Sequence, residues 1–221
     1  MSGTRKPPPR ETAKLDRTTI VEAAFAVLSE KGLDGLSLRV LASQLGVQAP
    51  ALYWHVRNKA ELIGMMAATF TEVAARAEPR EKTWAARLIA YGHALRQAML
   101  LHRDAARLCA IARPIEPPEE NANRVAAPLI AAGLDVRHAL SYQASVIAYT
   151  LGWVVYEQSQ PMHEHLAQML DLAQSFESGL RAMVRGFVAE FEEEAAKRTA
   201  RNVGSGANGR RTRRAERRGN S

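Results

Sequence analysis

The sequence predicts an all-α protein, and three observations support this fold class. Apolar residues recur at intervals of three and four positions along most of the chain, as they do on one face of an amphipathic helix. Residues that favour helix ends stand at the boundaries of these segments. No segment shows the alternation of apolar and polar residues, bounded by turn residues, that a β-strand would need.

The chain has 221 residues, of which 47% are hydrophobic, and its formal net charge is +7. This length and composition allow either one substantial core or a small module and a larger one. The positive charge is concentrated at the two ends, because residues 1–14 carry a net +3 and residues 197–221 a net +8. Residues 1–14, with three consecutive prolines, are predicted to form a disordered basic arm, and residues 199–221 a disordered basic tail.

The first two helices are predicted from their end residues. Asp16 is a good N-cap for a helix that Gly32 would end. Ser37 is the expected N-cap of a short second helix, which has apolar residues at helical spacing and ends at Gly46. Glycine suits both ends because it reaches the left-handed conformation without strain.

Two further helices follow closely. A third, short helix is predicted from about Gln48, with Pro50 in its first turn, where a missing N–H group costs no helical hydrogen bond. Asn58 is the expected N-cap of a fourth helix over 58–77, and Glu61 stands where a capping box places its acid. The N-terminal region is therefore predicted to contain three short helices and a longer connecting one.

Beyond Pro79 the predicted helices are longer, except for a short one after Pro161. The approximate ranges of the others are 83–101, 104–111, 119–132, 136–158 and 174–197. Residues 139–156 form an uncharged run of 18 residues, which is long enough to suggest a membrane span. The run contains several polar residues and lies between amphipathic helices, so a helix buried on all sides is the preferred interpretation. A partner subunit would most readily supply its neighbours.

The second and third helices, with the turn at Gly46, have the spacing of a helix-turn-helix, whose second helix enters the major groove of DNA. Such a helix should present small residues and hydrogen-bond donors to the groove. Leu52 and Val56 are expected on its opposite face, where they would hold it to the first two helices. Three residues at its start should allow a close approach to base edges, namely Ala49, Pro50 and Ala51.

Aromatic and basic side chains follow these small residues. Tyr53, His55 and Lys59 are expected to donate to phosphates, which fixes the register on DNA without reading its sequence. Trp54 has two interpretations: it either contacts the DNA backbone or packs in the core of the small domain, because indole offers a large apolar area and one donor. Arg57 is interpreted as a solvated surface charge.

Residues 15–66 resemble the DNA-binding domain of the tetracycline repressor (TetR) family, and the segment "LYWHVRNK" resembles the tetracycline repressors in particular. Weaker resemblances, at 102–114 and 148–158, lie in what would be the regulatory part. The family implies a homodimer of all-helical subunits that binds a palindromic operator in double-stranded DNA. It also implies that residues 67–198 form a larger helical domain for dimerisation and for binding a small-molecule effector.

The resemblance also assigns individual DNA contacts. In the family the second helix contributes a guanine-reading arginine, which falls on Arg39 here, and the lysine that begins the fourth helix, here Lys59, contacts phosphate. A guanidinium group can donate to both O6 and N7 of guanine. Ala49 and Ala51 stand where the tetracycline repressor has glutamine and threonine, so a different operator is expected. The predicted DNA-binding residues are Ser37, Arg39, Gln48, Ala49, Pro50, Ala51, Tyr53, Trp54, His55 and Lys59.

The predicted effector pocket departs further from the tetracycline repressors. Those proteins hold their drug with an imidazole, an asparagine and a magnesium-binding histidine. The resemblance places residues 73–75, Tyr91 and Cys109 at these positions, with Ala112 in place of a nearby threonine. Because the hard ligands of magnesium are missing, we expect a hydrophobic or aromatic effector in place of a magnesium–tetracycline chelate. The predicted ligand-binding residues, any one of which could alone be an ordinary core residue, are Tyr91, Leu95, Cys109, Arg113, Val125, Leu140, Gln143, Ala144 and Ile147.

No cofactor, metal site or catalytic residue is predicted. The sequence "GSGANG" at 204–209 follows no predicted strand, so it is not a dinucleotide-binding motif. His163 and His165 have no further ligands at metal-binding spacing. Cys109 is interpreted as a small buried hydrophobic residue in preference to a redox switch. An enzyme with a helical cavity is therefore a remote alternative to a repressor.

The basic tail and the protein as a whole each allow two interpretations. The basic tail could do little, or it could add a sequence-independent contact with DNA phosphates. The whole protein could be an architectural DNA-binding protein with low sequence specificity in place of a ligand-responsive repressor. The single cysteine and the N-terminus, which lacks the apolar run of a signal peptide, favour the cytoplasm, and no membrane partner is predicted.

Overall fold

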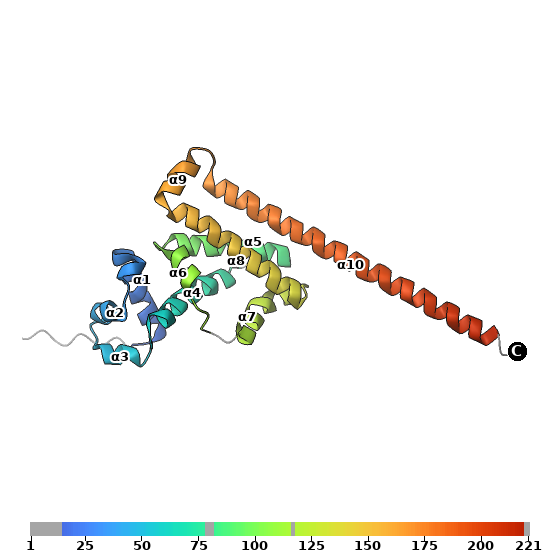
Figure 1. Cartoon of the computed structure of the whole chain (residues 1–221), viewed down its shortest axis with the longest axis horizontal. Helices are drawn as coiled ribbons and strands as arrows, with labels where there is room; N and C mark the ends of the chain where they lie inside the picture. Colours follow the sequence, from blue (N-terminus) through green and yellow to red (C-terminus); the bar gives the residue numbers. More distant parts are fainter. Residues whose placement is uncertain (1–14, 78–81, 116–117, 219–221) are drawn as a thin grey trace, which may run out of the picture.

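A computed structural model describes residues 15–77, 82–115 and 118–218. Residues 1–14, over which a basic arm is predicted, lie outside the described part. The described residues form ten α-helices and contain no strand, which confirms the all-α prediction. Figure 1 shows the smaller N-terminal group of helices at one end and the longer helices beside it. The ten helices are α1 (Arg17–Gly35), α2 (Leu38–Leu45), α3 (Ala49–Tyr53), α4 (Lys59–Ala75), α5 (Trp84–Leu100), α6 (Ala105–Ile111), α7 (Pro118–Ala131), α8 (Val136–Gln158), α9 (Gln160–Ala167) and α10 (Leu172–Arg218).

The predicted caps of the N-terminal helices are present. The side chains of Asp16, Ser37 and Asn58 accept hydrogen bonds from backbone N–H groups three residues on, at 2.9, 3.3 and 2.9 Å. Gly46 ends α2 in the left-handed conformation, with φ 67°. Gly32 also has a positive φ, 68°, but α1 continues for one further turn to Gly35 after this kink. The helix start signals therefore predicted the boundaries closely, whereas Gly32 marks a kink instead of an end.

Two hydrophobic clusters form the core of the described residues. The first contains apolar side chains of α1 to α4 and continues without interruption into α5 and α6, where it includes Leu95, Met99 and Leu108. The second lies among α5, α7, α8 and α10 and includes Tyr142, Phe176 and Leu180. The domain boundary predicted between residues 66 and 67 falls inside α4. α4 thus belongs to both predicted parts, and the first core crosses from one to the other.

The uncharged run forms most of α8, but it is not buried on all sides in the single chain. Val146, Thr150 and Val154 are buried. The opposite face is exposed because no other described helix packs on it, and its residues at helical spacing are Ser141, Ala144, Ala148, Gly152 and Val155. In the described part of the chain, no helix combines the length and apolar character that crossing a bilayer requires.

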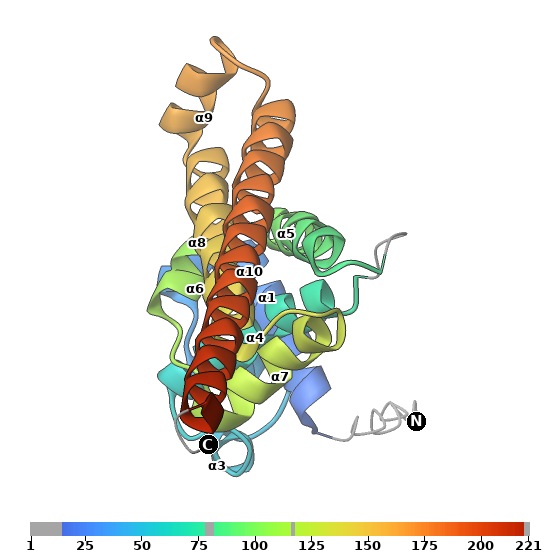
Figure 2. The ribbon, with the colours of Figure 1, turned by 90° about the vertical axis from the view of Figure 1, so that its right-hand side faces the viewer.

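The last helix differs most from its prediction. α10 runs to Arg218, where the sequence predicted an end near residue 197 and a disordered tail over 199–221. Residues 219–221 lie outside the described part. Ion pairs one turn apart, such as Lys197 with Glu193 at 2.7 Å, favour continuation past the predicted end. Figures 1 and 2 show that α10 packs beside α8 along its first part and then projects beyond the other helices.

Candidate functional site

The candidate DNA-reading helix is α3, which is held against the rest of the N-terminal region by two apolar side chains. Leu52 and Val56 are buried in the first core cluster, as the sequence predicts. The helix begins at Ala49, and Pro50 occupies its first turn. This arrangement fixes α3 on one face and leaves its other face open to solvent.

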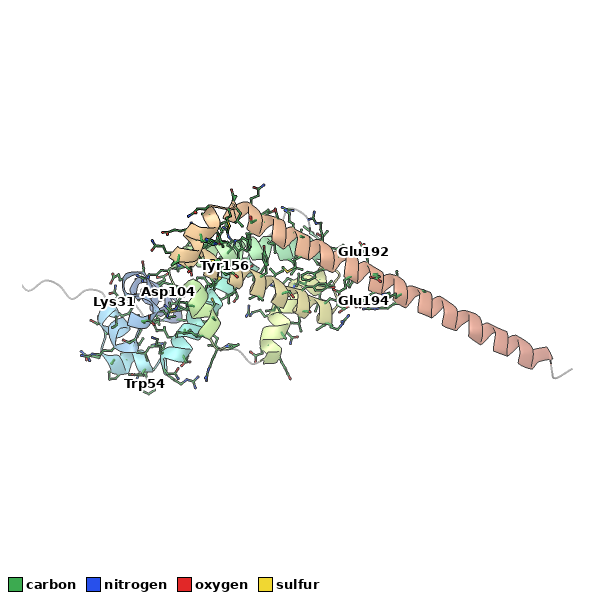
Figure 3. All side chains as sticks on the ribbon, turned by 45° about the horizontal axis from the view of Figure 1, so that its top comes forward. Lys31, Trp54, Asp104, Tyr156, Glu192 and Glu194 are labelled. Atoms are coloured by element: carbon green, nitrogen blue, oxygen red, sulfur yellow. The ribbon has the colours of Figure 1, made fainter. Side chains whose placement is uncertain are left out.

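Most of the predicted DNA-binding side chains lie on that open surface. Trp54 is 89% exposed, which excludes its alternative role as a core residue. Figure 3 shows its side chain at the outer edge of the N-terminal helices. The other exposed members of the predicted set are Arg39, Gln48, Pro50, Ala51, Tyr53 and His55.

Three members of the predicted set are partly buried and have structural roles as well. The Ser37 hydroxyl caps α2. Ala49 packs against the first core cluster. The Lys59 Nζ atom donates to the Leu33 carbonyl at 3.1 Å, so this lysine ties the start of α4 to the end of α1.

Arg57 is exposed, as predicted, but it is not a free surface charge. Its guanidinium group pairs with the Glu61 carboxylate at 3.1 Å, and its backbone N–H donates to the same carboxylate at 2.8 Å. Hydrogen bonds from Arg57 are the main cause of the lowered pKa of Glu61. The acid of the predicted capping box therefore holds the turn before α4.

Asp104 joins the N-terminal helices to the regulatory helices, and no pattern in the sequence singled it out. It precedes α6 with φ 57°, a conformation uncommon for residues other than glycine. Its carboxylate accepts a hydrogen bond from the Leu33 backbone N–H at 3.0 Å, next to the kink at Gly32. The nearby Arg107 pairs with Asp34 at 3.3 Å. The contact involves residues about 70 positions apart, so no local pattern in the sequence indicates it.

A cavity of about 290 Å³ lies between α4, α5, α6, α8 and the segment that follows α6. Four of the predicted ligand-binding residues line it, namely Leu95, Cys109, Arg113 and Ile147. The contribution of α4 was not predicted from the sequence, and it consists of Gly64, Ala67, Ala68 and Thr71. Small residues on a connecting helix carry no signal of a pocket until the position of the facing helices is known.

A smaller neighbouring cavity contains three more predicted residues, Tyr91, Val125 and Gln143. Thr71 and Arg124 line both cavities, so the two are adjacent. Leu140 and Ala144 were predicted as ligand contacts but line neither. Leu140 packs against the second core cluster, and Ala144 belongs to the exposed face of α8.

The lining of the two cavities is mostly apolar and is poorly suited to a hard cation. Ala75 lines the smaller cavity and Cys109 the larger one, near positions where the tetracycline repressors are expected to have imidazoles. Burial raises the pKa of the Cys109 thiol to about 12, so the thiol is protonated at neutral pH and weakly reactive. Within the described ranges, no group of three His, Cys, Asp or Glu side chains could hold a metal ion.

Comparison with known families and structures agrees with this arrangement. The model for bacterial regulatory proteins of the tetR family matches residues 20–66, which contain α2, α3 and the start of α4. The model for the tetracyclin repressor-like C-terminal domain matches residues 77–173, which contain α5 to α9 and so the walls of both cavities apart from α4. Together the two matches cover more than half of the chain.

Individual relatives show the same likeness. The class A tetracycline repressor from transposon 1721 of Escherichia coli is 40% identical over 148 residues, which cover 66% of this chain and 68% of the repressor. A single-residue variant of TetR from Acinetobacter baumannii AYE, solved in complex with minocycline, is 33% identical, with a TM-score of 0.66 over 80% of this chain and 98% of that one. The Streptomyces coelicolor protein ActR, solved in complex with actinorhodin, is 27% identical, with a TM-score of 0.65 over 80% and 97%.

Proposed function

The chain belongs to the TetR family of bacterial regulatory proteins, and from this premise we propose that it represses transcription as a homodimer on a palindromic operator until a hydrophobic or aromatic effector releases it. Members of the family are regulators and not enzymes, and they bind operator DNA and small-molecule ligands, typically as dimers. For this chain, the homodimer, the palindromic operator and the hydrophobic or aromatic effector are proposals that rest on the family and on the cavities. The proposal includes a cytoplasmic location, because the operator DNA of a bacterial repressor lies in the cytoplasm.

The position of the larger cavity against α4 carries this proposal. α4 begins at Lys59, directly after the α3 turn, and its residues from Gly64 to Thr71 form one wall of the cavity. A Cβ atom at Gly64 would lie 2.6 Å from the Arg113 carbonyl oxygen, so α4 touches the segment after α6 very closely at this point. A ligand in the cavity would therefore press on the same helix that carries the DNA-reading unit.

Release is proposed as a shift between two conformations. An effector that binds better to the conformation with a displaced α4 would populate that state and separate the reading helices of the dimer from successive major grooves. The exposed DNA-binding residues would make their contacts only in the other state. Ala49 and Ala51 would meet bases without hydrogen-bonding side chains, which supports an operator different from that of the tetracycline repressors.

The effector is proposed to be different from magnesium–tetracycline. The cavity lining offers Cys109 and Ala112 where a magnesium site would need hard oxygen or imidazole ligands. Aliphatic side chains of α5 and α8, namely Leu95, Ile147 and Leu151, form the wall that faces α4 and the segment after α6. An apolar cavity of this size suits a compact hydrophobic or aromatic molecule.

The exposed face of α8 supports the proposed homodimer. Its small residues would allow a second α8 helix to approach closely, with α10 alongside to complete a four-helix interface. The exposed side chains of Val155 and Tyr156 extend this face towards α9.

Footprinting on the DNA that flanks its own gene tests the proposal. A repressor dimer should protect one palindrome with half-sites about one helical turn or slightly more apart, and a hydrophobic effector should abolish the protection. Diffuse protection without a preferred sequence would instead identify an architectural DNA-binding protein. If Tyr91→Ala and Gln143→Ala both leave the effector response intact, the smaller cavity is not part of the effector site.

A further inference from the structure

The smaller cavity ends in polar donors that have no acceptor among the described residues. Gln143 on α8 is only 4% exposed, and its buried Nε2 atom has no hydrogen-bond partner of good geometry, although the Gln143 side chain is near enough to the Tyr91 hydroxyl to lower its pKa. The Nε atom of Arg87 on α5 is buried without a partner in the same way. Both residues line the smaller cavity. Buried donors of this kind are costly unless something accepts from them, so the pair points to a ligand with an acceptor group.

The charge of the lining points in the same direction. The charged residues that line the two cavities are Arg87, Arg113 and Arg124, and no carboxylate of the described residues lines either cavity. Tyr91 adds a hydroxyl, whose pKa burial raises to about 12, against smaller effects of Gln143 and Arg124. The hydroxyl is therefore a protonated donor at neutral pH. The Arg87 guanidinium, with the Tyr91 and Gln143 side chains beside it and no carboxylate in the described lining, favours an anion.

The donors lie beside the apolar cavity and not within it. Thr71 and Arg124 line both spaces, so a molecule that fills the larger cavity can extend past them towards Gln143. Thr71, Ala74 and Ala75 form the α4 wall of the smaller cavity. A ligand that occupies both spaces would touch α4 along more than two turns.

We propose that the effector of this protein is an organic anion with a hydrophobic ring system or chain, whose carboxylate binds to Arg87, Tyr91 and Gln143 while its apolar part fills the larger cavity. This inference rests on the proposed function, because it specifies the ligand of the same site. A carboxylate accepts from the guanidinium, hydroxyl and amide donors at once and compensates the positive charge. A carboxamide of the same shape brings its own N–H donors and no charge, so it is rejected.

Matched pairs of acids and carboxamides test the inference with the full chain. The probes are 2-naphthoic acid, 9-anthracenecarboxylic acid and decanoic acid, each compared with its carboxamide by isothermal titration calorimetry. We expect acids to bind about tenfold or more tightly than their carboxamides in at least one pair. Equal affinity within every pair, preference for the carboxamide, or no binding of any acid overturns the inference.

Variants locate the carboxylate. Arg87→Met and Gln143→Leu should each weaken binding of the preferred acid about tenfold and leave the carboxamide affinity unchanged. Arg185→Met, at an exposed position of α10 outside both cavities, is the matched control and should change neither affinity. Thermal unfolding of each variant verifies the fold. An acid affinity that survives both cavity variants with the fold intact contradicts the assignment.

Operator binding separates this inference from the proposed function. If an acid binds in the expected manner but never releases DNA, the inference about the site stands and the ligand-released repressor fails. If only neutral or cationic molecules release the protein from its operator, the repressor stands and the anionic effector fails. The two measurements therefore give distinguishable outcomes.

Discussion

Arg39 lies exposed near the start of α2, two residues after the Ser37 cap that fixes the direction of the helix. Its side chain is long enough to reach a base edge while the helix itself stays near the DNA backbone. The family resemblance assigns it to guanine, and its exposure in the structure is compatible with that role. It is the residue on which sequence-specific recognition is expected to depend most.

Replacing Arg39 with methionine should therefore weaken operator binding and relax its specificity at one base pair. A bidentate contact to guanine is worth about 1–3 kcal/mol of discrimination. Fluorescence anisotropy with the operator and with singly substituted operators measures both effects. Arg76→Met, at the exposed end of α4, is the matched control, and it should leave affinity and specificity unchanged. Full retention of specificity by Arg39→Met would assign the guanine contact elsewhere.

Trp54 shows what the sequence could not decide at the residue scale. Its surroundings in the sequence are equally compatible with a core position and with the DNA backbone. Its exposure depends on the short α3 helix ending at Tyr53, which turns the indole away from the core that Leu52 and Val56 enter. Helical periodicity predicts which side chains within a helix share a face. Trp54 follows the last residue of α3, so periodicity does not predict its direction.

At the scale of elements, the contact between α1 and the start of α6 is a direct polar connection between the predicted DNA-binding and regulatory parts. The Asp104 side chain is 20% exposed and accepts from the Leu33 N–H, whereas the Asp34 side chain nearby is 87% exposed. Figure 3 shows Asp104 close to the N-terminal helices. A movement of α6 in response to effector would act directly on the kinked end of α1.

Asp104→Ala should lower the free energy of unfolding by about 1–3 kcal/mol, because the Leu33 N–H loses its acceptor. It should also change the effector concentration needed for operator release, since the two parts are less tightly joined. Denaturant unfolding and an effector titration of the DNA complex measure these effects. Asp34→Ala, which removes the exposed acid of the same ion-pair group, should change stability by less than about 0.5 kcal/mol. Equal effects of the two variants would contradict the role of Asp104.

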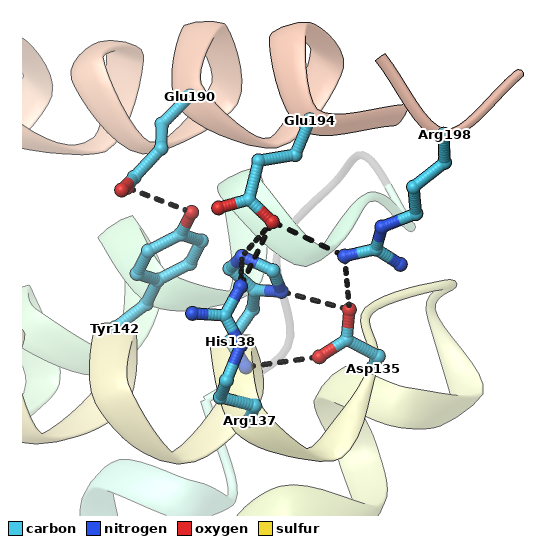
Figure 4. A network of polar contacts seen from close by, with 7 residues as sticks. All are labelled: Asp135, Arg137, His138, Tyr142, Glu190, Glu194 and Arg198. Carbon is cyan, nitrogen blue, oxygen red and sulfur yellow. Dashed lines mark hydrogen bonds and ion pairs between the residues drawn. The ribbon is translucent and has the colours of Figure 1, made fainter. Parts of the chain in front are cut away.

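The junction of α8 with α10 is held by a polar network, shown in Figure 4. The Asp135 carboxylate contacts Nδ1 of the buried His138 at 2.7 Å at the start of α8. Across the junction, Glu194 of α10 pairs with Arg137 at 2.8 Å, and within α10 it pairs with Arg198 at 3.1 Å. Hydrogen bonds from Arg198 and then Arg137 lower the pKa of Glu194 below its ordinary value of 4.5.

This lowered pKa predicts the pH dependence of the junction. A carboxyl group whose pKa is lower in the folded state stabilises the fold fully above its ordinary value, and the contribution is lost as the pH falls through the folded pKa. The thermal unfolding temperature of the unaltered protein should therefore fall more steeply below pH 4.5 than the unfolding temperature of Glu194→Gln. Glu192→Gln, two residues away and exposed, should follow the unaltered protein. Parallel declines in all three would show that the Glu194 pairs contribute nothing to stability.

At the scale of the whole molecule, the long α10 helix is the element that extends furthest beyond the other described helices. Its first part packs on α5 and α8, and its last part extends past the body, as Figures 1 and 2 show. The sequence of that last part is rich in arginine. The net charge of residues 197–221, +8, is therefore concentrated at this end of the chain.

Removing residues 199–221 should lower the salt dependence of operator binding, because each phosphate contact that is lost reduces the log–log slope by about 0.9. Binding isotherms over a series of potassium chloride concentrations measure this slope. The sequence preference of the truncated protein should remain that of the full chain, since the reading helices are intact. An unchanged slope would show that the basic end of the chain does not contact DNA.

The helix starts and the buried face of the reading helix follow from the amino-acid sequence without any tertiary information. Asp16, Ser37 and Asn58 mark helix starts because a cap acts on backbone groups only three residues away. Leu52 and Val56 were assigned to the buried face of the reading helix for a similarly local reason, the period of the helix. These inferences needed no knowledge of how the helices pack.

The contacts between helices, in contrast, depend on the packing of the whole chain. The sequence placed Leu140 and Ala144 in the effector pocket, yet one enters the second core and the other faces solvent, because periodicity cannot fix the rotation of α8 about its axis. The role of Asp104 and the α4 wall of the cavity could not be predicted either, because both depend on contacts with distant parts of the chain. Capping and periodicity are set within a few residues of chain, whereas cavities and contacts between domains depend on how distant helices cross.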